Sequence, residues 1–277
     1  MERASAAAFL AGDRLTRRVS EPEPQPRSPA ASRAWIDRIG FLLDVDPEGC
    51  RIAVDGDEVL GFAVSQNRGG VWYLATYGVV PEHQGQGLGR ELLEAVLAHA
   101  ADRPALFIST IHPGATRRYR RAGFSLKPLM RMVGTVDRTM LPAVTGLQDG
   151  QVDDVAWMDR LDRELRGAGH GPDHQHMLAT SRLMVSRAEG RRGYVYIDDD
   201  AGRPTLLAAE TTEIGQTLLW EALAAGDGAT LINAITAENE WAVDVGLAAG
   251  LDIGQEGYLA VRGMGVPAPY LPSGHFL

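Results

Sequence analysis

The stretch VVPEHQGQGLGR, residues 79–90, places three glycines within five positions, between an apolar run and an amphipathic run. These glycines let the backbone approach a ligand closely, because no Cβ stands in the way. A helix that opens at Gly87 leaves its first amides without intrahelical partners and directs its positive dipole end at the loop. Such a place binds phosphate, and a plain strand-to-helix turn is the alternative interpretation.

Two other phosphate-binding loops fit this stretch poorly. A dinucleotide loop reads G-x-G-x-x-G, with an acidic residue about 20 positions on. Here the spacing is G-x-G-x-G, and the later stretch reads FIST. A nucleotide triphosphatase loop ends in Gly-Lys-Ser/Thr, which is missing. The sequence therefore disfavours both of these nucleotide-binding classes.

The residues around the loop predict a sheet covered by helices. Strand signals come in a row before the loop, and after it Leu88, Leu92 and Val96 form an apolar stripe at helical spacing. A helix capped by Ser32 is expected to turn Trp35, Ile36, Ile39 and Leu42 or Leu43 inward. The predicted elements are helices over 4–17, from 32, from 88 and over 114–123, and strands over 51–54, 58–64, 71–80, 105–110 and 124–136, the last as a pair or one long bent strand.

The second half repeats this element order from about Pro142. Three strand signals, LMVSR, YVYID and PTLLAAE, precede a helix signal, IGQTLLWEALAAG, and a further strand, ATLINAI. The stretch HPGATRRYRRAGF from His112 aligns without gaps on NEWAVDVGLAAGL from Asn239. We therefore predict a duplicated chain with two domains, residues 1–138 and 139–277.

Composition and charge exclude several classes of function. A net charge of -9 argues against nucleic-acid binding and suggests a cationic acceptor, since polyanions need a basic face. The single cysteine, Cys50, cannot form an internal disulfide or a zinc cluster. No apolar run approaches the roughly 20 residues that span a bilayer, and the short ASAAAFLAG run lacks a convincing cleavage region. We expect a cytoplasmic protein without a membrane segment.

The glycine loop resembles the acetyl-coenzyme A signature of the GNAT superfamily of N-acetyltransferases, Q/R-x-x-G-x-G/A. Gln84, Gly87 and Gly89 match this signature. A later A-x-x-x-Y-x-x-x-G-F motif of the family is matched at Ala115, Tyr119, Gly123 and Phe124, and the resemblance spans about residues 35–137. It implies an α/β (α+β) fold of two GNAT-like domains, each a mixed, splayed β-sheet flanked by helices.

The resemblance also implies acetyl-CoA as cosubstrate and a set of residues that bind it. Backbone groups around Val79 and Val80 would bond the pantetheine arm, which lies between two strands that splay apart. Amides of the loop would cradle the pyrophosphate, and Ala115 belongs to the second cofactor motif. The implied loop residues are Gln84, Gly85, Gln86, Gly87, Leu88, Gly89 and Arg90.

Tyr119 stands at the family's position for the donor that protonates the departing thiolate. The alternative is a packing tyrosine with a satisfied hydroxyl. We predict direct attack of a neutral amine on the thioester without an acyl-enzyme, because Cys50 has no recognisable histidine partner. His112 stands where the family often has an asparagine, and four arginines at 117, 118, 120 and 121 would lie near the phosphates or on a solvated face.

The second half looks like a degenerate copy. Its stretch ETTEIG, residues 210–215, falls opposite the glycine loop and keeps one glycine, and Gly246 falls opposite Tyr119. We expect this half to bind no coenzyme A. The stretch GHGPDHQH holds His170, Asp173, His174 and His176, which could ligate a metal, but loop histidines without one are commoner and we expect no metal.

The predicted function is transfer of an acetyl group from acetyl-CoA to a primary amine of a small molecule or peptide. The alternative is a non-enzymatic acyl-CoA sensor. No general base is evident near the motifs; Tyr77 is a candidate on the strand before the loop. The apolar tail PAPYLPSGHFL, residues 267–277, is expected to pack on the body and to bring His275 or the Leu277 carboxylate into the cleft.

Overall fold

The structure is a computed structural model that describes residues 1–18, 21–198 and 201–276. Its N-terminal half contains α1 (Glu2–Thr16), α2 (Pro29–Val45), β1 (Cys50–Asp55), β2 (Glu58–Arg68), β3 (Val71–Val79), α3 (Leu88–Ala100), β4 (Ala105–Ser109), α4 (Pro113–Arg121) and β5 (Ser125–Thr135). Its C-terminal half contains β6 (Gln148–Asp149), α5 (Val155–Arg166), α6 (Asp173–Thr180), β7 (Arg182–Ser186), β8 (Gly193–Asp198), β9 (Arg203–Ala209), α7 (Thr212–Ala225), β10 (Ala229–Ile235), α8 (Trp241–Ala248), β11 (Asp252–Arg262) and β12 (Tyr270–Leu271). The mixed α/β fold class is confirmed.

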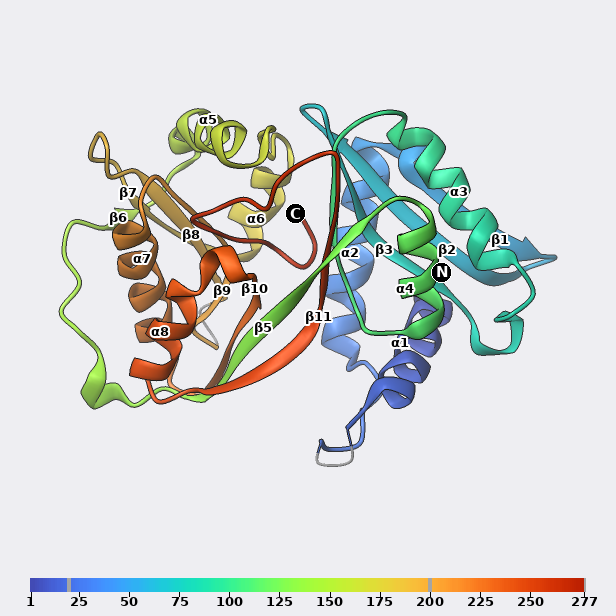
Figure 1. Ribbon diagram of the computed structural model, residues 1–277, viewed down its shortest axis with the longest axis horizontal. Coiled ribbons are helices and arrows are strands. Elements are labelled where there is room, and N and C mark those ends of the chain that lie inside the picture. The colour runs from blue at the N-terminus through green and yellow to red at the C-terminus, as the bar shows by residue number, and fades with distance from the viewer. Residues whose placement is uncertain (19–20, 199–200, 277) are drawn as a thin grey trace.

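One sheet contains strands from both halves. Its order is β1-β2-β3-β4-β11-β5-β10, so β11 lies between β4 and β5 and these two consecutive strands are not neighbours. Figure 1 shows β5 and β11 crossing between the halves as a long antiparallel pair. Among the described strands of this sheet only β3 and β4 pair in parallel, which makes the sheet mixed as expected.

The exchanged strands reveal the duplication. β5 and β11 each contain eleven residues and lie 127 positions apart, the offset that aligns His112 with Asn239. Each strand pairs with the strand before its counterpart, β11 with β4 and β5 with β10. The sequence predicts the repeat but not this exchange, and the boundary between residues 138 and 139 stays a prediction.

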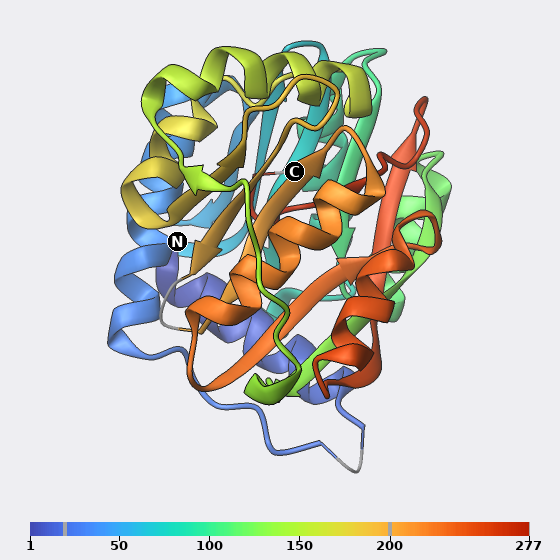
Figure 2. The same ribbon diagram turned by 90° about the vertical axis from the view of Figure 1, so that its left-hand side faces the viewer.

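The second sheet is antiparallel, in the order β12-β9-β8-β7-β6. In Figure 2, which views this half, α7 lies across the strands of the sheet. The opposite face packs on α5, α6 and also on α2 of the first half, through Trp35, Ile39 and Leu42. Helix α2 therefore shares a core with the second sheet, while Val64 of β2 belongs to the same cluster.

Most local predictions agree with the structure, but α2 begins earlier than expected. Ser28, not Ser32, caps the helix by accepting a hydrogen bond from the Ala31 amide at 3.2 Å, because Pro29 suits the first helical position. Ile36 is exposed rather than inward, and of the two alternatives Leu42 and Leu43 it is Leu42 that is buried. The segment after Phe124 forms one strand, β5, and in the described residues no helix is long and apolar enough to cross a membrane.

The C-terminal tail is docked, as predicted. Tyr270, Leu271 and Phe276 are at most 5% exposed, and β12 pairs with the edge of β9. In the first half the corresponding edge of β3 is open; in the second half the tail occupies it. The tail therefore pairs, through β12, with the edge of β9 that corresponds to the open edge of β3.

Candidate active site

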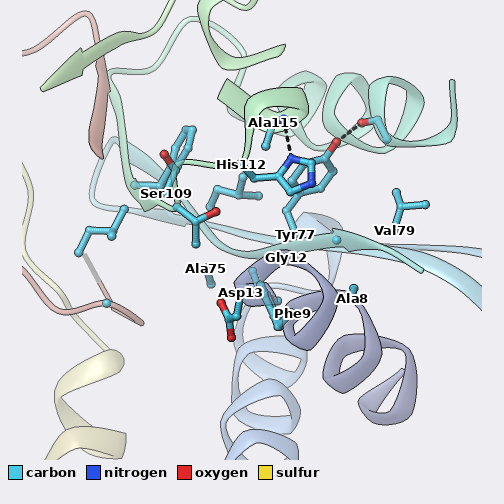
Figure 3. Close-up of a pocket in the computed structure, with 18 of the residues that line it drawn as sticks. Ala8, Phe9, Gly12, Asp13, Ala75, Tyr77, Val79, Ser109, His112 and Ala115 are labelled. Atoms are coloured by element: carbon cyan, nitrogen blue, oxygen red, sulfur yellow. Dashed lines mark hydrogen bonds between the residues drawn. The ribbon is translucent and has the colours of Figure 1, made fainter. Parts of the chain in front are cut away.

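A cleft opens where β3 and β4 part. The two strands pair only at Trp72↔Ala105 and Tyr73↔Leu106, so their facing edges beyond these residues lack a strand partner. A cavity of about 890 Å³ follows these edges and reaches the glycine loop, α1, α2, α4 and the C-terminal tail. In Figure 3, His112 and Ala115 lie on one side of β3, and Phe9, Gly12 and Asp13 of α1 on the other. Unpaired strand edges offer hydrogen bonds to an extended ligand.

The glycine loop presents a run of free amides at one end of this cavity. The Gln84 amide donates to the Pro81 carbonyl. The Arg90 amide donates to the carbonyl of Gly87, the residue before α3. The five amides between them, residues 85–89, make no hydrogen bond within the part of the chain described. Gly85 and Gly87 have φ of 82° and 96°, a conformation that favours glycine. The N-terminus of α3 also lacks a side-chain cap, so this loop suits a phosphate.

Close packing behind the loop requires Gly89. A Cβ there would lie 2.7 Å from the Tyr77 hydroxyl and 3.1 Å from the Arg118 guanidinium. The Tyr77 hydroxyl donates to the Gly89 carbonyl at 2.5 Å and accepts from Arg118 at 3.4 Å. Burial raises the pKa of Tyr77, although Arg118 opposes the shift. Tyr77 therefore fixes the loop, and its hydroxyl is already committed as a donor.

The backbone groups expected to bond the pantetheine arm are partly used inside the protein. The Val80 amide donates to Leu60 at 2.9 Å, and the Val79 carbonyl accepts from the Gln84 side chain at 3.0 Å. Two hydroxyls further into the cavity lack partners in the described structure, those of Thr76 and Ser109, each on a residue 8% exposed. A buried hydroxyl without a partner is costly, so a bound ligand would satisfy both.

Tyr119 lines the same cavity from α4. Its ring contacts Phe107 with centroids 4.6 Å apart and lies 6.2 Å from the ring of Tyr77. The residue is 5% exposed, yet its hydroxyl makes no hydrogen bond with any described residue. Burial raises its pKa well above the usual value of 10. The phenol therefore stays protonated at neutral pH and faces the cavity as an unused donor.

Comparison with known proteins assigns this half of the chain. Residues 13–124 match the model of the acetyltransferase (GNAT) family. This segment belongs to the GNAT family. It contains the glycine loop, the splayed strands and Tyr119, so the predicted resemblance is confirmed.

Curated relatives and solved structures agree with the assignment. Mycothiol acetyltransferases of Arthrobacter sp. (strain FB24) and Kytococcus sedentarius are 35% and 40% identical over 101 and 97 residues, which cover 33% and 32% of this chain. The chain spans less than a third of the length of these relatives, 29% and 30%.

A Pyrococcus horikoshii structure superposes with a TM-score of 0.73 at 16% identity and covers 98% of this chain and 89% of its own. A GCN5-related N-acetyltransferase of Kribbella flavida covers 95% and 70%, with a TM-score of 0.55 at 17% identity. At these identities both show the fold, which extends over both halves.

His112 orders the start of α4, which contains the expected second cofactor motif. Its Nδ1 accepts hydrogen bonds from the Gly114 and Ala115 amides at 3.2 and 3.4 Å, so His112 caps α4. Burial and then Arg118 lower its pKa. Of the four arginines in α4, Arg117 and Arg118 line the cavity, while Arg120 donates to the Phe124 carbonyl. The family's asparagine position is thus filled here by a neutral capping histidine.

Asp13 of α1 is a site residue that the sequence analysis missed. It is the one carboxylate among the described lining residues of the cavity. It makes no hydrogen bond or ion pair with any described residue. Burial raises its pKa above the usual value of an aspartate. Nothing in the local sequence marks Asp13, because it reaches the GNAT cleft only when α1 packs on β2 and β3.

The tail reaches the GNAT cavity, where Gly274 and His275 contribute to the lining. Phe276 anchors the tail through ring contacts with Phe41 and His176, at centroid distances of 6.2 and 5.1 Å. The ring of His275 is exposed to the cavity, yet the surrounding protein and the guanidinium of Arg38 lower its pKa to about 3. Leu277 lies outside the described residues.

The corresponding positions of the second half lack these features. The Thr211 hydroxyl caps α7 by accepting from the Ile214 amide, and the Glu210 carboxylate accepts from the Arg192 amide. A Cβ on Gly246, opposite Tyr119, would lie 2.5 Å from Met132, so a larger side chain has no space there. At these positions this half presents a capped helix and a strand edge paired with β12.

The histidine-rich stretch is dispersed among several partners. Asp173 pairs with Arg68 at 2.8 Å, and His170 bonds the Tyr270 hydroxyl at 2.9 Å. His174 alone joins a group whose possible ligand atoms lie within 4.8 Å of one another, with Asp159 and Asp162. Its Nε2 lies 3.5 Å from each carboxylate, and, although burial opposes it, these neighbours raise the pKa of His174. A buried ion pair accounts for this geometry.

Proposed function

We propose that the protein transfers an acetyl group from acetyl-CoA to the primary amine of a small molecule by direct attack. One observation carries the proposal: a single cavity joins the glycine loop, at Gln84, Gly85 and Gly89, to the splayed strands and the unpaired hydroxyl of Tyr119. The curated relatives are named for a small molecule, mycothiol, which supports a small acceptor.

The residues of the cleft suit coenzyme A in two ways. The amides of residues 85–89 would hold the pyrophosphate at the N-terminus of α3, aided by Arg118. The open edge of β3 and the hydroxyls of Thr76 and Ser109 would bond the pantetheine amides. Acetyl-CoA then supplies an acetyl thioester at the inner end of the cleft.

Two side chains of the protein would transfer the protons of the reaction, one to the departing sulfur and one from the amine. The amine nitrogen forms a bond to the acetyl carbon as the carbon–sulfur bond breaks. Tyr119, whose buried phenol is protonated at neutral pH, would donate its hydroxyl proton to the departing sulfur. Asp13 accepts the proton lost by the amine, directly or through water.

Thiol release from acetyl-CoA, measured with a panel of primary amines, tests the proposal. We expect turnover on at least one amine, an N-acetyl product by mass spectrometry, and one coenzyme A bound per chain by calorimetry. Binding without turnover on any amine would instead favour the acyl-CoA sensor. Two cofactors per chain would contradict the assignment of a single cofactor site to the first half.

A further inference from the structure

The lining of the cleft has the opposite charge sign to the chain. The chain has a net charge of -9, whereas the described lining residues include one carboxylate, Asp13, and several guanidinium groups. The lining arginines are Arg27, Arg38, Arg117, Arg118 and Arg203. The expectation of a cationic acceptor, drawn from the net charge, therefore does not describe this cleft. Its local field favours anions.

Three of the five arginines are accounted for by neighbouring protein groups or by the expected cofactor phosphates. Arg117 and Arg118 lie on α4 on the glycine-loop side, where the cofactor phosphates are expected. Arg27 donates to Glu2 at 3.0 Å and lies over the ring of Trp35 at 5.2 Å. These groups leave Arg38 and Arg203 to be explained.

Arg38 has no counter-ion in the described structure. It is half-buried on α2, and no hydrogen bond or ion pair to a described residue satisfies its guanidinium. Burial and then the nearby Arg27 lower its pKa to about 10, so it is still charged at neutral pH. A partly desolvated guanidinium without an anion is unfavourable, and its planar donor fork matches a carboxylate or phosphate.

Arg203 and His275 of the tail line the same cavity as Arg38. Both arginines also lower the pKa of His275, which agrees with this placement. Arg203 pairs with Asp198 at 2.7 Å, which leaves part of its donor fork available. The second half of the chain therefore completes this end of the cavity.

Arg38 and the phosphate loop belong to different elements of the lining. Arg38 lies on α2, whereas the loop precedes α3 and has Arg118 of α4 beside Gly89. The arginines of α4 are therefore the ones expected to meet the cofactor phosphates, and Arg38 on α2 is available to a second anionic group.

We propose that the acceptor amine also carries an oxyanion, a carboxylate or a phosphate, which Arg38 and Arg203 bind at the end of the cleft completed by the tail. This inference rests on the proposed acetyl transfer and names its substrate class. Asp13 faces the same cavity and would take the amino group, so a small zwitterionic amine fits the charges of the lining.

Matched acceptor pairs test this inference. Free amino acids are compared with their amides, and phosphoethanolamine with ethanolamine, by kcat/KM for thiol release. We expect the anionic member of the best pair to be preferred about 10- to 100-fold, the range of a hydrogen bond to a charged group. The two sets of pairs distinguish a carboxylate from a phosphate.

Variants at residue 38 test whether Arg38 causes the preference for the anionic acceptor. Arg38→Gln should remove it by lowering kcat/KM for the anionic member alone, and Arg38→Lys should keep part of it. Arg33→Gln, an exposed arginine on the same helix, is the matched control and should change neither value. Equal use of both members, or an equal loss on both in Arg38→Gln, would overturn the inference.

Failure of the proposed function has a different signature. If no amine releases thiol, the anionic amines are titrated into coenzyme A-saturated protein by calorimetry. Binding by the wild type that Arg38→Gln loses supports the oxyanion site without catalysis. Absence of binding in the wild type would reject it.

Discussion

Replacing Tyr119 by phenylalanine separates chemistry from packing. The ring, which contacts Phe107 at 4.6 Å and lies near Tyr77, is kept, and the hydroxyl that is removed has no partner among the described residues. No internal hydrogen bond is broken, so the free energy of unfolding should change by less than about 0.5 kcal/mol. For a chain of this size that corresponds to a Tm shift of about 1–2 °C.

The effect on turnover should be much larger. Burial raises the pKa of Tyr119, so the wild-type phenol is a donor throughout the neutral range. Loss of a positioned proton donor lowers a rate by about 10² to 10⁴. This loss equals roughly 2.7 to 5.4 kcal/mol of barrier height, which is several times the expected change in stability.

Steady-state thiol release gives kcat and KM for Tyr119→Phe, and calorimetry gives the coenzyme A affinity. The affinity should stay within about twofold, because the loop amides are untouched. Tyr77→Phe is the contrasting variant: it removes the hydrogen bond to the Gly89 carbonyl and should weaken coenzyme A binding. Unchanged turnover in Tyr119→Phe would refute the donor role and leave a packing tyrosine.

Three other predictions address the loop, the base and acid stability. Gly87→Glu strains a residue at φ 96° and repels phosphate, so coenzyme A affinity should fall more than about tenfold in calorimetry. Burial raises the pKa of Asp13, so kcat/KM should fall as pH drops through that pKa, and Asp13→Asn should lower turnover and abolish this acidic limb. Burial alone would raise the pKa of Asp154, but hydrogen bonds, first from Arg187, lower it to about 2. Its ionised form then stabilises the fold above about pH 4, and this contribution is lost as pH falls toward 2. In thermal melts, Asp154→Asn should have a lower Tm than the wild type at pH 7. Its Tm should also change less than that of the wild type between pH 4 and pH 2.

Residues that act within one short segment could be predicted from the sequence. The glycine loop, the amphipathic helix after it and the motif containing Tyr119 combine chemistry with local spacing, so a pattern over a dozen residues identifies them. The docked tail was predictable for a similar reason, since Tyr270, Leu271 and Phe276 are too apolar to remain solvated.

Residues assembled from distant segments could not be predicted. Asp13, Arg38 and Arg203 come from two helices and a strand of the second half, and each is an ordinary charged residue in its local sequence. The helix cap at Ser28 was missed because two serines precede the apolar stripe and only the backbone decides between them. Strand exchange leaves no trace in the sequences of β5 and β11. Each strand buries the same face whichever strand it pairs with, so its pattern of apolar residues is unchanged.

The insertion of β11 beside β4 has a consequence for synthesis of the chain on the ribosome. β4 ends at Ser109 and β11 begins at Asp252, so the edge of β4 that faces away from the cleft waits for roughly 140 further residues to be translated. At about 5–20 residues per second, the edge of β4 stays unpaired for about 7 to 30 seconds. The nascent first half therefore presents an open strand edge to chaperones and to neighbouring chains during this interval, and a ribosome stalled between the two strands exposes it for longer.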